Sequence, residues 1–429
     1  MLQRILELSA LRSSMAKNAS WLLAGQGVNL FLRTVCFILL ARLLGVTQYG
    51  LFAGAFALVN MAAPYSDLGF GMLFMSDVSG DRSTAKSCLG NALLATVVAS
   101  TAICMIAVFS GPFLTGVKSR TLFVVLTISN CLFMQITLVA SRVFQIYEKM
   151  RLTATLQTIV NVVRLAAVIA MLVSLHRATA LDWALASMFA SGCAAGVAFV
   201  WVWEEVGGIS FHPLRIVRRI WEGMQFSLSG SAVTIYNDVD KTMLSHYGWV
   251  KEDGFYSLAY RIIDLISAPI QALAAASLPR YFHLSRTSLR AMGRLVRKTV
   301  RTGFFFATAA IVVLLVFSPV IPKLVGRDFS SVIVVLRWLC LIPIFRSIHM
   351  LTGSALTGAG RQGIRTSMQV IVALLNIGLN FWWIPRRGWV GAAESSLICD
   401  GLLAVSTASV VFLIMRNSPP PQSHFPLAI

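Results

Sequence analysis

Charged residues are scarce in this sequence of 429 residues, of which only 12% are Asp, Glu, Lys or Arg. A soluble globular domain carries about 25% of them, so the composition excludes an ordinary soluble fold. Acids are the scarcest, with 17 Asp and Glu against 36 Lys and Arg. The hydrophobic fraction is 57%, the mean hydropathy is +0.76, and long apolar runs recur along the chain. Runs of about 20 apolar residues can each cross a bilayer, so the sequence predicts a membrane protein with many spans.

Several motifs that carry chemistry are also missing. No GxxxxGK[ST] loop is present to cradle a nucleotide phosphate. The seven cysteines have no CxxC or other metal-ligand spacing, and most fall inside apolar runs, where Cys packs as a small hydrophobe. No cleavable signal is evident after the first residues. We therefore expect no cofactor, no metal site and no disulfide framework, and energy from an ion gradient or from consumption of the product.

The apolar runs predict an all-α membrane protein of about 12 transmembrane helices, because lipid offers no partner to an open strand edge. The expected spans are 20–44, 49–75, 88–110, 121–144, 153–175, 182–203, 223–247, 254–279, 302–322, 329–353, 366–385 and 390–415.

The basic residues set the expected orientation. Alternate loops carry 21 Lys and Arg on one side and 9 on the other, so the positive-inside rule predicts a multi-pass protein with both termini cytoplasmic. The most basic loop is 280–301, where Arg286, Arg290, Arg294 and Arg297 recur on one helical face. This loop predicts contact with anionic lipids. The net charge of +19 resides mostly in such loops, so no nucleic-acid partner is expected.

The two halves of the chain resemble each other. The stretch GVTQYGLFAGAFALV at 45–59 is echoed by GWVKEDGFYSLAYRII at 248–263, with Gly50 and Gly254 separated by 204 residues. Six helices per half predict a parallel repeat, in which two six-helix lobes enclose a central cleft. The expected parts are an N-terminal lobe, a cytoplasmic connector, a C-terminal lobe and a cytoplasmic tail, at 1–203, 204–222, 223–415 and 416–429.

Cations inside the apolar runs are the main candidates for a binding site, because a charge at bilayer depth costs about 2.5–3.5 kcal/mol. They suggest an internal aqueous path for an anionic substrate, although each could instead form a structural pair with an acid on another helix. The expected cleft residues are Arg33, Arg164, Arg337, Arg346, Lys241 and Arg261. Lys241 and Arg261 each have a local acid three residues away, Asp238 and Asp264, so a purely structural role stays open for both.

Three intramembrane acids are candidates for coupling to an ion: Asp400, Asp67 and Glu394. Asp400 is the foremost, because it lies near the middle of its span without a local cation. It could pair with an arginine on another helix or carry a coupling proton.

Two stretches resemble a known family. ARLLGVTQYGLFAGAFALVNMAAPYSDLGFG at 41–71, and Asp240-Lys241 followed by GFYSLAYR at 254–261, resemble bacterial polysaccharide flippases. These form the Wzx-type, oligosaccharidyl-lipid branch of the multidrug/oligosaccharidyl-lipid/polysaccharide exporter superfamily, whose fold is MATE-like. The resemblance implies a flippase that moves undecaprenyl-diphosphate-linked oligosaccharide across the bacterial inner membrane for cell-surface polysaccharide biosynthesis, by alternating access. Other polysaccharide assembly proteins are further expected partners.

Three other functions compete with this interpretation. A multidrug/cation antiporter of the same superfamily is disfavoured, because the first helix carries Arg33 and no acid. A lipid II-type flippase of the same fold stays open, since the sugar is not readable from sequence. A membrane enzyme is not expected, because the short non-cytoplasmic loops hold no paired-carboxylate or Ser-His-Asp arrangement.

Overall fold

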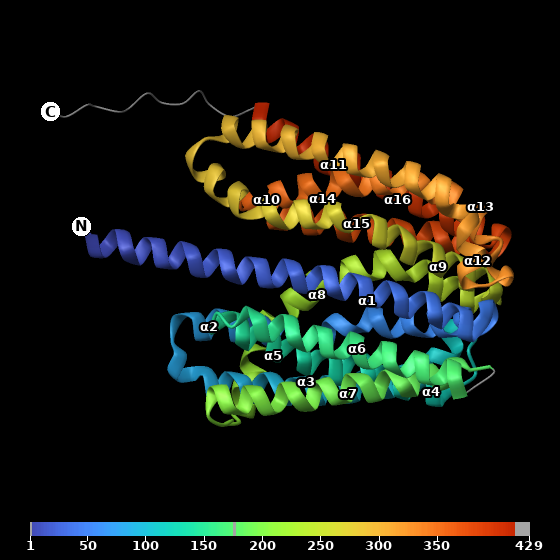
Figure 1. Cartoon of the computed structure of the whole chain (residues 1–429), viewed down its shortest axis with the longest axis horizontal. Helices are drawn as coiled ribbons and strands as arrows, with labels where there is room; N and C mark the ends of the chain where they lie inside the picture. The colour runs from blue at the N-terminus through green and yellow to red at the C-terminus, as the bar shows by residue number, and fades with distance from the viewer. Residues whose placement is uncertain (1, 175–176, 417–429) are drawn as a thin grey trace. The chain divides into compact units, whose positions relative to one another are not determined.

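The fold of this chain was analysed in a computed structural model that describes residues 2–174 and 177–416, with side chains from Gly25 onward except those of Ser229 and Arg286 (Figure 1). The described residues form α-helices, short 3-10 turns and one π-helical segment, and no strand occurs among them. The prediction of an all-α protein is confirmed.

The first two expected spans are two arms of one helical rod, α1 (Leu2–Ala62), which breaks at Gly45. Gly45 has φ +67° and ψ +171°, a conformation that a residue with a Cβ rarely adopts. The second arm ends earlier than the expected residue 75. Pro64 opens a 3-10 turn, and Leu68 and Gly69 take positive φ values before α2 (Phe70–Gly80) begins.

The remaining helices of the N-terminal half follow the expected order. They are α3 (Ala85–Thr115), α4 (Arg120–Thr127), the π segment η3 (Ile128–Phe133), α5 (Met134–Ile146), α6 (Met150–Ser174) and α7 (Ala180–Val206). The segment η3 joins α4 and α5 into the expected fourth span. Of the expected connector 204–222, only 207–212 is non-helical, because α8 (Pro213–His246) already begins at Pro213.

The C-terminal half continues with α9 (Val250–Ile266), α10 (Ala268–Thr287), α11 (Leu289–Phe317), α12 (Ile321–Val325), η5 (Arg327–Phe329), α13 (Val332–Trp338), α14 (Ile342–Gly358), α15 (Gln362–Arg387) and α16 (Trp389–Arg416). The expected tail 416–429 lies outside the described residues beyond Arg416.

The number of apolar helical stretches in the described residues is somewhat lower than the expected twelve or so. In the described residues nine helical stretches are long and apolar enough to cross a membrane, or ten when the bent pair of α9 and α10 counts as one span. The other expected spans are the second arm of α1, which belongs to the same long stretch as the first, and the span 223–247, nearly all of it in α8, which is not among these stretches.

Two compact units make up the chain. The first comprises Met1–Ser257 with Pro322–Ser330, and the second comprises Leu258–Ile321 with Ser331–Ile429. In the first unit α1 runs beside α6 (Figure 1) and also packs against α8. In the second, α14 packs against α10, α11 and α16. The expected lobes 1–203 and 223–415 rest on the sequence repeat and stay a prediction.

Candidate functional site

Arg33 is held by a ladder of amide groups between α1 and α6. Its Nε donates to Asn161 Oδ1 at 3.3 Å. Asn161 Nδ2 in turn donates to Asn29 Oδ1 at 2.7 Å and to the carbonyl oxygen of Gln157 at 2.9 Å. Arg33 is exposed in this unit, whereas Asn29 and Asn161 are buried. Amide partners orient a guanidinium without neutralising its charge.

Arg164 extends the same polar face, one turn after Asn161 on α6. It is half-buried, and its Nη2 donates to Ser191 Oγ on α7 at 3.1 Å. Ser129 on η3 donates to the same Ser191 hydroxyl at 3.2 Å. The two arginines predicted from sequence to act together are therefore linked through α6, by a set that we call the arginine ladder: Arg33, Asn161, Arg164 and Ser191.

Asp67 forms a structural hub at the start of α2. Its Oδ1 accepts the N–H of Gly69 at 3.0 Å, and its Oδ2 accepts the N–H of Gly71 at 3.1 Å and Nη1 of Arg142 at 2.7 Å. A Cβ on Gly71 would lie 1.6 Å from Arg142 Nη1. The D-L-G-x-G pattern therefore caps α2 and seats an arginine from α5. A coupling ion that bound Asp67 would have to compete with these bonds for the carboxylate oxygens.

Lys241 lies in a buried network on α8. Its Nζ contacts Asp238 Oδ1 at 3.0 Å, as the local spacing predicts, and Asp240 Oδ1 at 3.5 Å. Tyr256 donates to Asp240 Oδ2 at 2.7 Å, and Asn60 on α1 donates to Asp238 Oδ2 at 2.6 Å. The sequence did not single out Asn60, since only the contact between α1 and α8 reveals it.

The other predicted cations belong to the second unit. Arg346 on α14 is buried, forms an ion pair with Asp264, and lies 5.8 Å from the ring centroid of Tyr260. Asp264 was expected to pair locally with Arg261, and the structure shows an ion pair of Asp264 with Arg346 from another helix. Arg261 and Arg337 are both exposed.

The acids of the second unit have separate surroundings. Asp400 is 1% exposed, and its Oδ1 lies 3.4 Å from Nε2 of His349 on α14. His349 was missed from sequence, because nothing in the spacing of residues 349 and 400 indicates that they meet. Glu394 accepts two hydrogen bonds from Arg387 Nη1, at 3.0 and 2.7 Å, near the start of α16.

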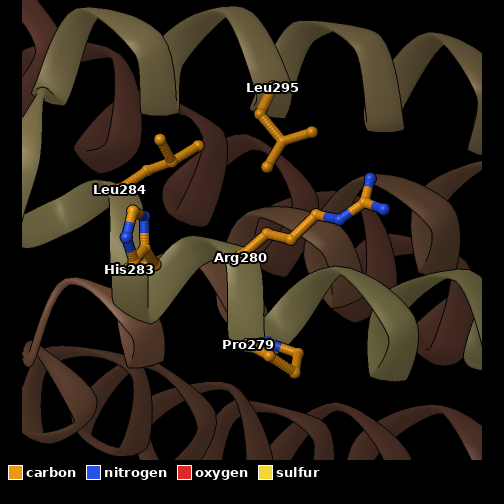
Figure 2. Close-up of a pocket in the computed structure, with 5 residues that line it drawn as sticks. All are labelled: Pro279, Arg280, His283, Leu284 and Leu295. Atoms are coloured by element: carbon orange, nitrogen blue, oxygen red, sulfur yellow. The ribbon is translucent and has the colours of Figure 1, made fainter. Parts of the chain in front are cut away.

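A cavity of about 380 Å³ lies between α10 and α11, in the segment predicted to meet anionic lipids. It is lined by Pro279, Arg280, His283, Leu284 and Leu295. Figure 2 shows Arg280 extending between the two helices below Leu295, with His283 and Leu284 further along α10. No Asp or Glu occurs anywhere between residues 265 and 327 of the sequence, so the segment that lines this cavity carries only basic charge.

Two protein families match the chain. Residues 15–285 match the family described as polysaccharide biosynthesis protein, and residues 227–382 match the MatE family. A stretch of 165 residues is 25% identical to the probable low-salt glycan biosynthesis flippase Agl15 of Haloferax volcanii. That stretch covers 38% of this chain and 35% of the relative, so the match spans about a third of the length of that protein.

Solved structures share the fold. An inward-facing multidrug resistance transporter of the MATE family, in the MOP superfamily, superposes with a TM-score of 0.75 at 13% identity, covering 91% of this chain and 96% of that one. The lipid II flippase MurJ in an inward closed conformation gives a TM-score of 0.72 at 14% identity, covering 95% of this chain and 94% of that one. The MATE-like fold predicted from sequence is confirmed by these likenesses.

Proposed function

Because the chain belongs to the polysaccharide biosynthesis protein family, we propose that it is a flippase that moves a lipid-linked glycan across a membrane. The substrate that we propose is an oligosaccharide joined through a diphosphate to a polyprenyl lipid, undecaprenyl in bacteria. The membrane is then the bacterial inner membrane, with both chain termini on the cytoplasmic side.

The arginine ladder is the observation that supports this proposal most directly. A lipid-linked diphosphate sugar has an anionic, hydrophilic head, and the head needs a cationic and hydrated path while its tail stays in lipid. Arg33 and Arg164 supply two cations within predicted membrane spans, oriented by neutral amide and hydroxyl groups. Guanidinium groups bind phosphate oxygens through paired hydrogen bonds. We propose that this face receives the diphosphate or an acidic sugar.

Movement by alternating access is part of the proposal. The two halves of the chain, 1–203 and 223–415, would rock about the connector 204–222 and open the arginine ladder to each side in turn. The sequence repeat supports this division, since parallel repeats commonly produce such motions.

A cation antiporter is the second candidate, because the MatE family matches residues 227–382. A site for cationic drugs needs acids where this chain places Arg33 and Arg164. The arginine ladder therefore favours an anionic substrate. A lipid II-type flippase fits the same cations, and only the sugar would distinguish it.

The basic cavity between α10 and α11 suggests a lipid partner. We propose that it holds the headgroup of an anionic phospholipid, with phosphate against Arg280 and acyl carbons against Leu284 and Leu295. Arg280→Ala should reduce the anionic lipid that co-purifies with the protein, measured by native mass spectrometry. Lys323→Ala, which removes an exposed cation outside this cavity, is the control.

The flippase proposal is tested at Arg33. Arg33→Ala should abolish translocation at normal protein level, and Arg33→Lys should retain part of it. The measurement is accumulation of the lipid-linked glycan on the cytoplasmic face of cells that depend on the variant. Arg120→Ala removes an exposed arginine at the start of α4 and should leave translocation unchanged. Full activity of Arg33→Ala would exclude this binding site, and loss of the protein itself would assign Arg33 a structural role.

A further inference from the structure

The two sequence echoes of the half-repeat meet in the first unit. A Cβ on Gly50 of α1 would lie 2.0 Å from the carbonyl oxygen of Val250, and a Cβ on Gly254 of α9 would lie 2.2 Å from the carbonyl oxygen of Val46. Val46 and Val250 are separated by the same 204 residues as Gly50 and Gly254. The contact is therefore reciprocal, as at an interface between two copies related by a two-fold axis.

A third glycine brings in a carboxylate. A Cβ on Gly54 would lie 2.4 Å from Ser245 Cβ and 3.0 Å from Asp253 Oδ2. Backbone and small side chains thus close this contact so tightly that no space is left for another side chain. We call the set of Val46, Gly50, Gly54, Val250 and Gly254 the glycine contact.

Asp253 is completely buried at the glycine contact, with 0% exposure. Ser257 Oγ donates to its Oδ1 at 2.8 Å, while its Oδ2, directed at Gly54, has no hydrogen-bond partner among the described residues. Lys241, Asp240 and Asp238 are close enough to act on it electrostatically. The one ammonium group among them already contacts Asp238 and Asp240.

The other charged and titratable groups around Asp253 come from each neighbouring element. They are Tyr49 on α1, His246 on α8, Glu252 and Tyr256 on α9, and the exposed Arg327 and Asp328 on η5. None of these forms a hydrogen bond or ion pair with Asp253 in the part of the chain that the structure describes.

An ionised carboxylate is strongly disfavoured in such surroundings, because burial removes its hydration and no cation of its own replaces it. The first turn of α9 favours negative charge through the helix dipole, which offsets only a small part of that penalty. Proton binding would remove the charge and would allow the unbonded oxygen to remain buried. Separation of the glycine contact would return water to the carboxylate and favour ionisation.

We propose that Asp253 binds a proton when the glycine contact closes and releases it when the contact opens. The carboxylate takes the proton from water as its environment dries, and no other bond is made or broken. A low pH in the solution that reaches the opened contact then favours the closed glycine contact. Protonation of Asp253 therefore returns the protein to this closed state after the substrate has left. The role in the transport cycle rests on the proposed flippase function, whereas the proton-linked closure can be measured without substrate.

The test uses spin labels on Thr47→Cys and Lys251→Cys, two exposed positions that flank the glycine contact and share the separation of 204 residues. The seven native cysteines are first replaced by alanine. Distances between labels are measured in lipid nanodiscs from about pH 5 to about pH 9, a range that includes the titration of known buried carboxylates. The short-distance population should rise as pH falls. Asp253→Asn should hold that population constant across the range, and Glu252→Gln, at the neighbouring half-buried carboxylate, should keep the normal response.

Ser257→Ala provides an independent variant should Asp253→Asn fail to fold. The Ser257 hydroxyl donates to the carboxylate, so its loss should shift the midpoint upward by about one pH unit. An unchanged response in Asp253→Asn, or an unchanged midpoint in Ser257→Ala, would overturn the proton site. Normal pH-dependent closure in a protein that moves no lipid-linked glycan would leave the proton site standing and overturn the flippase function instead.

Discussion

At the scale of single residues, the partners of each charge separate structure from candidate function. Asp67 has hydrogen bonds to both carboxylate oxygens and an arginine at 2.7 Å, so its buried carboxylate is both hydrogen-bonded and paired with a cation. Arg33 and Arg164 instead bind amide and hydroxyl groups. These amide and hydroxyl groups orient the two guanidinium groups.

The Asp67–Arg142 pair gives the first prediction. Arg142→Ala should lower the free energy of unfolding by about 3 kcal/mol, because it leaves a buried carboxylate without its cation. The loss should lie at the low end of the usual range, since the Arg142 side chain keeps 22% exposure. Thermal unfolding in detergent measures it. The double variant Asp67→Asn/Arg142→Ala should recover part of the loss. Equal stability of Arg142→Ala and the wild type would contradict the structural role of the Asp67–Arg142 pair.

Asp400 gives the second prediction. The acid is buried beside His349, where an arginine partner or a coupling proton had been the two expectations. Asp400→Asn should uncouple transport from an imposed pH gradient in proteoliposomes, because an amide cannot carry the proton. Asp81→Asn, at an exposed acid that caps a turn, should stay coupled. Gradient-driven transport at the normal rate in Asp400→Asn would show that the proton is carried elsewhere.

At the scale of helices, the apolar runs were sufficient to place nearly every span. The break at Gly45 falls in the gap expected between the spans 20–44 and 49–75. Hydropathy averages over a whole span, so it alone could not reveal the turn at Pro64 or the π segment in the fourth span. Those features depend on single backbone conformations. The family motif at 67–71 was visible in the sequence, but its role as a cap became clear only from the bonds to Gly69, Gly71 and Arg142.

Pairing between helices was the least predictable part. The local pair of Asp238 and Lys241 followed from helical spacing and is confirmed. The pairs Arg346–Asp264 and Asp400–His349 join different helices, so they depend on how each helix is rotated and shifted along its axis. A single sequence does not carry that information. Asp253 was missed for the same reason, since only packing shows that it is buried at a glycine contact.

The glycine contact gives a prediction at this scale. Gly50→Ala should destabilise the fold by about 1–3 kcal/mol, because its Cβ would overlap a backbone carbonyl that cannot rotate away. Gly378→Ala is the matched control on α15, where an added Cβ meets nothing within 4 Å. That substitution should be neutral or should stabilise by up to about 1 kcal/mol through helix propensity. Thermal unfolding of both variants measures the difference, and equal effects would show that the helices do not approach closely at Gly50.

At the scale of the whole molecule, the charges of the loops and the half-repeat both bear on the proposed transport motion. Alternate loops with 21 and 9 basic residues predict an even number of spans with both ends on one side. The half-repeat predicts equivalent helices, and the reciprocal glycine contact joins residues that are equivalent in that repeat. In the proposed rocking of the two halves, such a contact opens in each cycle. The glycine contact is therefore the place where the proposed motion can be stopped.

The last prediction is that a covalent link across the glycine contact stops the proposed motion. In a chain whose native cysteines are replaced, Thr47→Cys and Lys251→Cys should be joined by a short, reducible thiol crosslinker across the glycine contact. The link should block glycan translocation, because α9 can then no longer separate from α1. A reductant should restore translocation. Each single-cysteine variant, treated in the same way, should transport normally, which separates the link from modification of either site. Complete crosslinking with undiminished transport would exclude opening at this contact, and transport would then have to proceed while Gly50 and Gly254 remain packed against the opposing backbone.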